Sequence, residues 1–391
     1  MGEDHVQRRD FLKVLGLGTL GLTFSLESSA REPPVGSDLT LFVGTYTSGK
    51  GEGIYIYRMD KASGELKHLD TVKGVINPSF LAIDPKKRYL YAVNEVEEFA
   101  GKAGGAVSAF SIDQKTGALS PLNQQPTHGG GPCHLVVDGS GKFVLVANYV
   151  GGSLSVLPVH EGGSLGPAAD IVQHRGSGPD PERQQRPHAH CVTLDRFNRY
   201  AFAADLGIDK VLIYRFDEKS GKLTTNHPAW IQTKPGAGPR HFTFHPKGNF
   251  AYLINELDST VSAFTYYPKT GELKEIQTIP TLPAGFSGPN SCAEICVSPS
   301  GKFVYGSNRG HDSIVTFKIN DGTGQLTQVE TVSTQGKTPR SFTVDPSGTF
   351  LLVANQNSDT VVSFRIDPDT GRIRPTGQTT GIPTPVCLYF L

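Results

Sequence analysis

The sequence predicts an all-β fold built from repeated four-stranded units. Each unit opens with an apolar strand such as residues 239–246 or 339–346, followed by a turn with Gly or basic residues. A second apolar run then ends in Asn or Asp, at Asn94, Asn148, Asp205, Asn255, Asn308 and Asn355. Two further runs follow, separated by turn residues typical of hairpins. Six complete copies of this pattern are visible.

The spacing of the units predicts the architecture. The third residue of the first strand is aligned at Phe80, His134, His190, His241, Glu294 and Ser341, which gives spacings of 54, 56, 51, 53 and 47 residues. These values lie near the roughly 40–50 residues of a four-stranded propeller blade.

A seventh unit is split between the two ends of the chain. Residues 39–46 resemble a second strand without a first, and residues 385–391 resemble a first strand with nothing after it. If the two segments pair, the ring closes and leaves no open sheet edge. The sequence therefore predicts one seven-bladed β-propeller over residues 39–391.

The N-terminal residues have the features of an export signal. Arg8 and Arg9 precede Phe11, Leu12 and Lys13, a Gly-rich apolar run covers residues 14–26, and small residues end at Ala30. The run is too short to span a bilayer and resembles a twin-arginine signal, although Gln7 replaces the usual Ser or Thr. We expect a signal peptide at residues 1–30, a linker at 31–38 and a periplasmic or otherwise exported product. An ordinary secretory signal would imply the same destination.

Composition narrows the range of partners. The 37 Lys and Arg residues balance 37 Asp and Glu residues, so charge does not favour nucleic acid or an anionic membrane as a partner. The five cysteines are an odd number, and Cys292 and Cys296 would lie about 13 Å apart along one strand, too far for a disulfide. We expect buried thiols, with a Cys133–Cys191 pair as the alternative. The sequence contains no nucleophile elbow, Walker loop or dinucleotide fingerprint.

Strand direction predicts where polar residues converge. The first and second strands of a blade are antiparallel, so the start of one and the end of the other share a face. The first strands bring His134, His188, His190, Arg240, His241, Glu294 and Arg340 to this face. The loops after the second strands bring Tyr46, Glu95, Tyr149, Leu206, Glu256, Arg309 and Gln356, and the loop before the fourth blade brings Asp180, Glu182 and Arg183. Such loops at the mouth of a rigid scaffold are common binding sites.

Simpler roles remain open for several of these residues. The repeated Asn and Asp residues are expected to bond backbone at turns, and His245 is expected to be structural on the opposite face. Arg240 and Arg340 would either pair with acids between blades or bind substrate. His188 and His190, with His241 or Glu294, are of the kind that binds metal, but no supporting pattern accompanies them. We predict neither a metal nor a cofactor.

Several motifs resemble one known family. Residues 181–190, 204–211, 238–241, 255–261, 281–286, 307–314 and 337–340 are similar to the seven-bladed lactonase family, which includes propeller-type 6-phosphogluconolactonases and muconate lactonizing enzymes. The resemblance covers the chain from about residue 39 and implies a metal-free site of His190, Arg240, Glu256 and Arg309. The other residues expected to bind substrate are Glu182, Arg183, His134, His188, His241, Glu294 and Arg340. The exported start departs from the family's cytosolic members.

The resemblance implies hydrolysis of an acidic sugar lactone. His190 is the expected general base, because the unperturbed pKa of histidine lies near neutrality. Glu256 would orient that imidazole or share the proton transfer, and Arg240 and Arg309 would bind an anion and stabilise the oxyanion. Two alternatives stay open: a muconate-type lactonizing cycloisomerase, and a non-catalytic exported propeller that binds a ligand.

Overall fold

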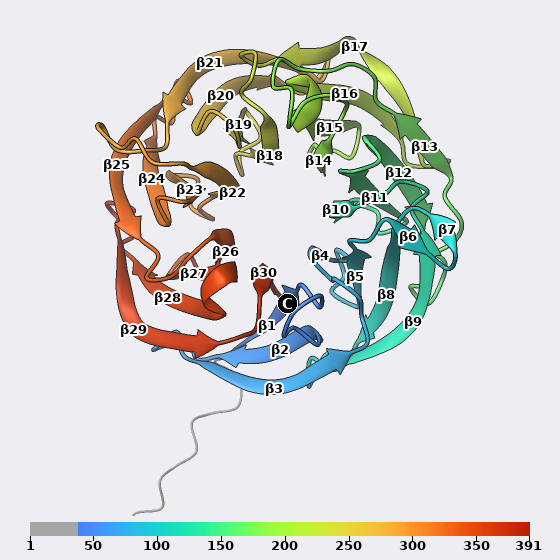
Figure 1. Ribbon diagram of the computed structural model, residues 1–391, viewed down its shortest axis with the longest axis horizontal. Helices are drawn as coiled ribbons and strands as arrows, with labels where there is room; N and C mark the ends of the chain where they lie inside the picture. Colours follow the sequence, from blue (N-terminus) through green and yellow to red (C-terminus); the bar gives the residue numbers. More distant parts are fainter. Residues whose placement is uncertain (1–37) are drawn as a thin grey trace, which may run out of the picture. The chain divides into compact units, whose positions relative to one another are not determined.

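The computed structural model describes residues 38–391, and the predicted signal peptide and nearly all of the linker lie outside them. Within this part of the chain, seven four-stranded antiparallel sheets surround a common centre (Figure 1). The prediction of a seven-bladed β-propeller is therefore confirmed. No helix of the described residues has the length and apolar character needed to cross a bilayer.

The strands fall into four concentric sets. The innermost strands are β30 (Pro385–Phe390), β4 (Leu81–Ile83), β10 (Pro132–Val137), β14 (Ala189–Leu194), β18 (Pro239–Phe244), β22 (Ser291–Val297) and β26 (Pro339–Val344). The second strands are β1 (Leu39–Thr45), β5 (Tyr89–Asn94), β11 (Phe143–Asn148), β15 (Tyr200–Asp205), β19 (Phe250–Asn255), β23 (Phe303–Arg309) and β27 (Phe350–Asn355).

The outer half of each blade completes the sheet. The third strands are β2 (Gly53–Met59), β8 (Ala106–Ile112), β12 (Ser153–Pro158), β16 (Lys210–Asp217), β20 (Thr260–Tyr267), β24 (Ser313–Ile319) and β28 (Thr360–Ile366). The outermost are β3 (Leu66–Lys73), β9 (Leu119–Pro126), β13 (Asp170–Gln173), β17 (Lys222–Gln232), β21 (Glu272–Pro280), β25 (Leu326–Ser333) and β29 (Ile373–Gly381). A small hairpin, β6 (Glu98–Phe99) and β7 (Lys102–Ala103), and two short 3₁₀ helices, η1 (Leu206–Ile208) and η2 (Gln356–Ser358), decorate the loops.

The two ends of the propeller share one blade, as the sequence predicts. β30 pairs antiparallel with β1, and the partners include Val43 with Leu388 and Leu41 with Phe390. The sheet order β3-β2-β1-β30 places the C-terminal strand innermost. This pairing closes the ring and removes the open edges that each end would otherwise leave.

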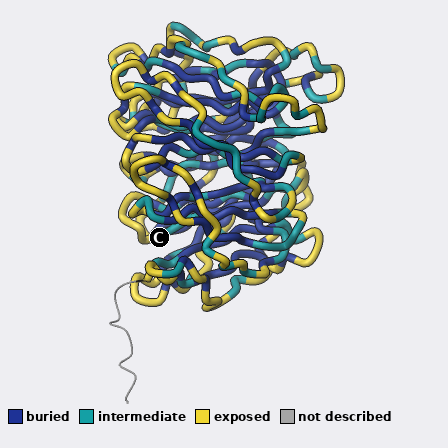
Figure 2. Tube along the Cα trace, turned by 90° about the vertical axis from the view of Figure 1, so that its left-hand side faces the viewer, coloured by how far each residue is buried: buried dark blue, intermediate teal, exposed yellow. Residues whose placement is uncertain are grey.

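Apolar side chains hold neighbouring blades together. Phe202 of β15 packs on Phe242 of β18, with ring centroids 5.5 Å apart, in a cluster drawn from two adjacent blades. The buried strands lie inside, and the exposed residues concentrate in turns and loops (Figure 2). All five cysteines are unpaired and lie on innermost strands, so the disulfide alternative is wrong.

A bulge in the innermost strands decides which side chains face the top of the channel. In β14, Ala189 pairs with Asp205 and Cys191 with Ala204, so His190 is the extra residue. The same irregularity makes Cys133, Arg240 and Arg340 the extra residues of β10, β18 and β26. A bulge re-aims a side chain and recurs near active sites.

This register corrects one element of the sequence alignment. His190 is equivalent by repeat to Cys133, Arg240 and Arg340, not to His134 and His241. The true equivalent of His134 and His241 in β14 is Cys191. The His-Ala-His sequence explains the one-residue error, because Ala189 stands where β10, β18, β26 and β30 carry proline.

Candidate active site

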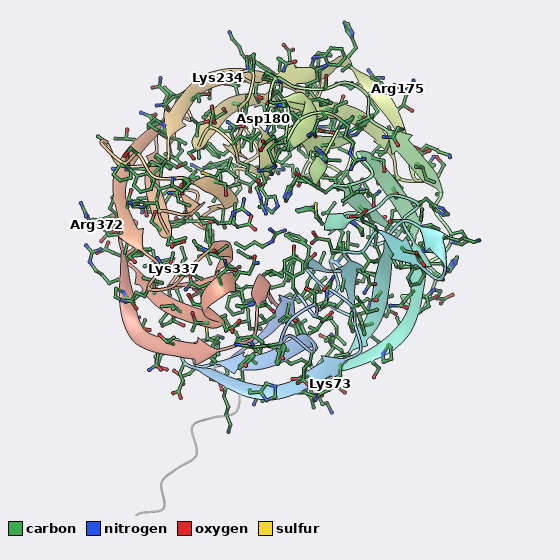
Figure 3. All side chains as sticks on the ribbon, viewed as in Figure 1. Lys73, Arg175, Asp180, Lys234, Lys337 and Arg372 are labelled. Atoms are coloured by element: carbon green, nitrogen blue, oxygen red, sulfur yellow. The ribbon has the colours of Figure 1, made fainter. Side chains whose placement is uncertain are left out.

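A cavity of about 350 Å³ lies where the starts of the innermost strands meet the loops after the second strands. This is the face that strand direction predicted. Sticks from the innermost strands project into the centre of the ring (Figure 3). The lining residues are Tyr46, Glu95, Cys133, Tyr149, Arg183, His190, Glu256, Ser291, Arg309 and Arg340.

Glu256 is the electrostatic centre of the site. Its Oε1 accepts a hydrogen bond from Arg183 Nη2 at 2.6 Å, and its Oε2 lies 2.9 Å from both Arg240 Nε and Arg309 Nη2. Burial alone would raise the pKa of Glu256, but Arg309, Arg240 and Arg183 outweigh it and lower the pKa to about 2. The side chain is therefore a carboxylate at neutral pH.

The role expected for Glu256 needs correction. A carboxyl group with a pKa of about 2 holds no proton to share near neutrality. Among the described residues, no hydrogen bond joins Glu256 to His190, so it does not orient that imidazole directly. Glu256 instead fixes three guanidinium groups, which would otherwise repel one another.

Arg240 lies behind the cavity wall instead of in it. Its side chain is 2 % exposed, and it donates from Nε to Glu256 and from Nη1 to the carbonyl of Ala293 at 2.6 Å. The expectation that Arg240 binds substrate directly is therefore not supported by its position. It pairs with an acid, as the alternative proposed, although that acid belongs to its own blade.

Arg309 and Arg340 line the cavity, as Arg183 does. Arg309 donates from Nη2 to the carbonyl of Cys292 at 2.7 Å, and burial lowers its pKa to about 10, so it stays a cation at neutral pH. The Arg340 guanidinium lies 5.3 Å from the centre of the Tyr46 ring and 4.0 Å from Glu95 Oε2. The Tyr46 hydroxyl donates to the same carboxylate at 2.9 Å.

The site carries an excess of positive charge. Four arginines face two carboxylates at this level of the channel, a formal net charge of +2, from Arg183, Arg240, Arg309 and Arg340 against Glu95 and Glu256. Guanidinium groups recognise carboxylates and phosphates through paired hydrogen bonds. The cavity is suited to an anionic or strongly polar ligand.

His190 lines the cavity, where its surroundings favour the neutral imidazole. Its Nδ1 lies 3.7 Å from Cys133 Sγ, and its ring stands edge-on to Tyr149, with centroids 5.4 Å apart. Burial lowers the pKa of His190 well below its usual value, and the charges of Arg240 and Arg340 lower it further. The imidazole is therefore neutral and able to accept a proton.

Cys133 shares the bulge position of His190 but is not a nucleophile at neutral pH. Burial raises the pKa of its thiol well above the usual value. The reactive thiolate is therefore not populated. Its Sγ lies 3.4 Å from the His190 carbonyl oxygen, within hydrogen-bond distance for a thiol donor.

The loop before β14 places Arg183 in the lining of the cavity. Asp180 Oδ1 accepts hydrogen bonds from the backbone N–H groups of Glu182 and Arg183, both at 2.9 Å, and so fixes the turn. The Arg183 side chain then reaches Glu256 and the Tyr149 hydroxyl. Glu182 itself is exposed and does not line the cavity.

The remaining predicted site residues support the cavity from outside its lining. The His188 ring stacks on Tyr149 with centroids 4.5 Å apart, and its Nδ1 lies 2.9 Å from the Tyr149 carbonyl oxygen. His134 and His241 lie deeper, where the rings of His134 and Phe80 are tilted by 33° with centroids 4.1 Å apart. Glu294 is bonded to His241 at 2.8 Å and likewise does not line the cavity.

Some lining residues were not among the predicted site residues. Tyr46, Glu95 and Tyr149 were expected on this face but were not selected, and Cys133 and Ser291 were overlooked. The bulge position that Cys133 shares with His190 is the signal that would have found it. In residues 38–391, no group of three or more His, Cys, Asp or Glu side chains is arranged to hold a metal ion.

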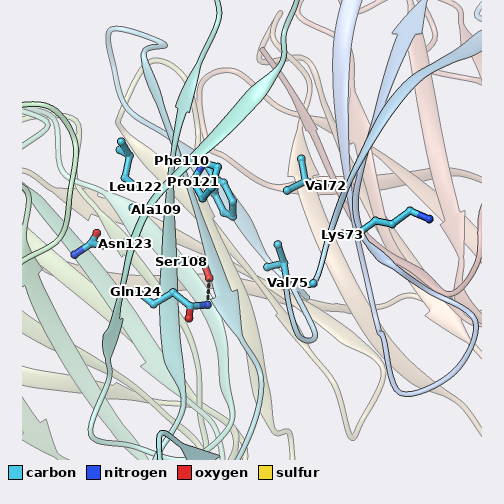
Figure 4. A pocket seen from close by; sticks show the side chains of 11 residues that line it. Val72, Lys73, Val75, Ser108, Ala109, Phe110, Pro121, Leu122, Asn123 and Gln124 are labelled. Atoms are coloured by element: carbon cyan, nitrogen blue, oxygen red, sulfur yellow. Dashed lines mark hydrogen bonds between the residues drawn. The ribbon is translucent and has the colours of Figure 1, made fainter.

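A second cavity, of about 360 Å³, lies at the outer rim between two blades (Figure 4). Val72 and Val75 face Phe110, Pro121 and Leu122 across it. Gln124 Nε2 donates to Ser108 Oγ at 2.8 Å, which satisfies both groups. Lys73 is its one charged lining residue.

The buried carboxylate predicts a specific effect of Glu256→Gln. Breaking a buried ion pair by removing one partner lowers the free energy of unfolding by about 3–5 kcal/mol. Because the folded pKa is depressed, this stabilisation is present above the usual carboxyl pKa and is lost as pH falls through about 2. Urea unfolding between pH 7 and pH 2.5 measures both effects.

The matched control is Glu98→Gln, which removes an exposed carboxylate of β6. The control is expected to unfold like the wild type at pH 7. A Glu256→Gln variant as stable as the control at pH 7 would contradict the role given to this carboxylate.

Comparison with known proteins agrees with this geometry. The family model described as a lactonase, 7-bladed beta-propeller, matches residues 40–390. The chain is 40% identical over 350 residues to the 6-phosphogluconolactonase of Bacillus subtilis, an alignment that covers 90% of this chain and 97% of that protein. It is 39% identical over 308 residues to the 6-phosphogluconolactonase of Formosa agariphila, covering 78% and 86% of the two chains.

A solved structure shares both fold and sequence. The periplasmic gluconolactonase of Pseudomonas aeruginosa superposes with a TM-score of 0.86 at 38% identity, covering 91% of this chain and 99% of that one. The family match over residues 40–390 includes every residue that lines the cavity. The chain belongs to the seven-bladed β-propeller lactonase family.

Proposed function

We propose that this protein hydrolyses a sugar lactone in the cavity at the channel mouth. The observation that carries the proposal is the neutral His190 imidazole in a cavity lined by three arginines. Lactone hydrolysis needs a base for water, cations for the carbonyl oxygen and a holder for the sugar. The family membership supports the same activity.

In this mechanism His190 takes a proton from a water molecule, and the resulting hydroxide adds to the lactone carbonyl carbon. The carbonyl oxygen becomes an oxyanion, which Arg309 or Arg340 stabilises across the cavity. When the bond between the carbonyl carbon and the ring oxygen breaks, the ring oxygen takes the proton back from His190. Positioned proton transfer of this kind is worth roughly 10²–10⁴-fold in rate.

Glu256 and Arg240 act by fixing the positions of the cavity arginines Arg183 and Arg309. Glu256 ties Arg183 and Arg309 to one carboxylate, and Arg240 balances that carboxylate from behind. Preorganised charges need not rearrange when the oxyanion forms. This preorganisation is the source of most of the rate enhancement at sites of this kind. Arg183 is the most exposed of the three arginines around this carboxylate, at 40 %, and so is suited to meet a charged substituent of the sugar.

The activity itself is the first test. His190→Ala is expected to lower lactone hydrolysis by roughly 10²–10⁴-fold after subtraction of spontaneous opening, because the base is removed. The assay uses purified protein from residue 31 onward with gluconolactone and 6-phosphogluconolactone, with and without chelator. The control His160→Ala removes an exposed imidazole and should leave the rate unchanged.

Unchanged hydrolysis in His190→Ala would contradict the assignment of the base. Absence of turnover on both lactones in the wild-type protein would contradict the proposed function. An absorbance change with carboxymuconate would then point to the lactonizing alternative.

We further propose that the protein acts outside the cytoplasm. The paired Arg8 and Arg9 before a short apolar run support export, and a similar chain from Pseudomonas aeruginosa is described as periplasmic. In that setting we expect the unphosphorylated lactone to be the working substrate. Arg8→Lys with Arg9→Lys should leave the full-length protein in the cytoplasm on cell fractionation, and continued export of this variant would exclude the twin-arginine route.

A further inference from the structure

A second layer of side chains lies directly below His190. The residue after each bulge is His134 in β10, Cys191 in β14, His241 in β18 and Ser341 in β26. Glu294 in β22 lies at the same level, since it bonds to His241. The rings of Phe80, His134 and His241 contact one another at this depth.

Two members of this layer form a buried acid–imidazole pair. His241 Nδ1 lies 2.8 Å from Glu294 Oε1, and their side chains are 6 % and 14 % exposed. Glu294 Oε1 also accepts a hydrogen bond from the backbone N–H of Ile295 at 3.1 Å. Neither side chain lines the cavity, and the mechanism above uses neither.

The pair touches the general base. The rings of His241 and His190 lie with centroids 5.1 Å apart and planes inclined by 66°. The Nε2 atom of His241 is buried and has no hydrogen-bond partner among the described residues. His190 has no carboxylate of its own within hydrogen-bond distance in this part of the chain.

The pair holds one exchangeable proton near neutrality. Burial raises the pKa of Glu294 to about 7, although Arg240 opposes the shift, and burial lowers the pKa of His241 well below its usual value. When Glu294 is protonated, it donates to His241 Nδ1, and the hydrogen of the neutral ring is on Nε2. When Glu294 is ionised, Nδ1 carries the hydrogen and the pair bears a negative charge.

We propose that the Glu294–His241 pair is the charge partner of His190, and that its negative charge stabilises the imidazolium formed when His190 takes a proton from water. The proposal rests on the proposed lactone hydrolysis. Water gives its proton to His190, hydroxide adds to the carbonyl carbon, and the proton returns to the departing ring oxygen. Glu294 and His241 are positioning residues and are chemically unchanged at the end of the cycle.

Other charged and titratable groups face Glu294 from the strands packed around it. Cys296 shares its strand β22. The neighbouring strands contribute Arg240 and His241 from β18, His134 from β10, Arg340 from β26, Cys191 from β14 and Cys387 from β30. The two arginines are permanently charged, and burial keeps the histidines neutral and the thiols protonated. Glu294 is therefore the group of this layer that changes charge near pH 7.

The test is Glu294→Gln in the protein from residue 31 onward. With gluconolactone, kcat of the wild type should rise as pH increases through about 7, because the ionised pair favours the imidazolium. In the variant kcat at pH 8 should fall about tenfold, KM should stay within about twofold, and the rise through pH 7 should disappear. The control Ser341→Ala changes the same layer at the neighbouring blade and should keep the wild-type profile.

The loss of activity should not come from unfolding. Because the folded pKa of Glu294 is raised, ionisation of this carboxyl destabilises the folded state as pH increases from its usual pKa through about 7. Glu294→Gln removes this effect, so its melting temperature at pH 8 should equal or exceed that of the wild type.

A measurement without turnover tests the pair directly. The ¹⁵N shifts of His241 should show Nε2 losing its hydrogen as pH rises through about 7 in the wild type and not in Glu294→Gln. No such change, an unaltered pH profile in the variant, or a loss confined to KM would overturn the proposal. Full activity in His190→Ala would instead overturn the proposed mechanism, whatever Glu294→Gln does.

Discussion

The pairing of β30 with β1 is the constraint on which the rest of the structure depends. It joins segments that are more than 300 residues apart in the chain and completes the seventh four-stranded sheet. Without it, β1 would present an open strand edge and the central channel would have a gap where β30 lies. The cavity at the channel mouth draws residues from all seven blades, from Tyr46 after β1 to Arg340 in β26. Closure of the ring therefore sets the distances within the site.

The bulges convert this scaffold into a functional surface. At the same position of four innermost strands, the extra residue is Cys133, His190, Arg240 or Arg340. Burial lowers the pKa of His190, and the charges of the two arginines, Arg240 and Arg340, lower it further and so favour its neutral form. Glu256 forms ion pairs with Arg183, Arg240 and Arg309. Its negative charge offsets the repulsion among the three guanidinium groups and keeps them close together. One repeated backbone irregularity thus supplies both His190 and part of its electrostatic environment.

Much of this arrangement could be predicted from sequence, because it follows from periodicity. Four-stranded repeats, a split blade and antiparallel strand order are enough to place His190, Glu256, Arg309 and Arg340 on one face. The same reasoning could not separate the two layers of the channel, because a one-residue bulge leaves no clear mark in the pattern of apolar residues. His190 was therefore aligned with His134 and His241, which lie one layer below it.

Side-chain burial is the other feature that could not be predicted from the sequence. Arg240 stands at the start of an innermost strand, as a substrate-binding residue would, yet it turns behind Glu256. Glu182 belongs to a conspicuous polar run but is exposed and does not line the cavity, unlike its neighbour Arg183. These outcomes depend on the three-dimensional balance of charges, which strand order alone does not specify.

The central claim is that the cavity at the channel mouth is the site of sugar-lactone chemistry. It is tested most directly by a crystal structure of the protein with the hydrolysis product gluconate, at a concentration that saturates binding in solution. The account predicts the product carboxylate beside His190 and within hydrogen-bond distance of Arg309 or Arg340. Gluconate bound in the outer cavity lined by Val72 and Leu122, with the channel mouth empty, would contradict it.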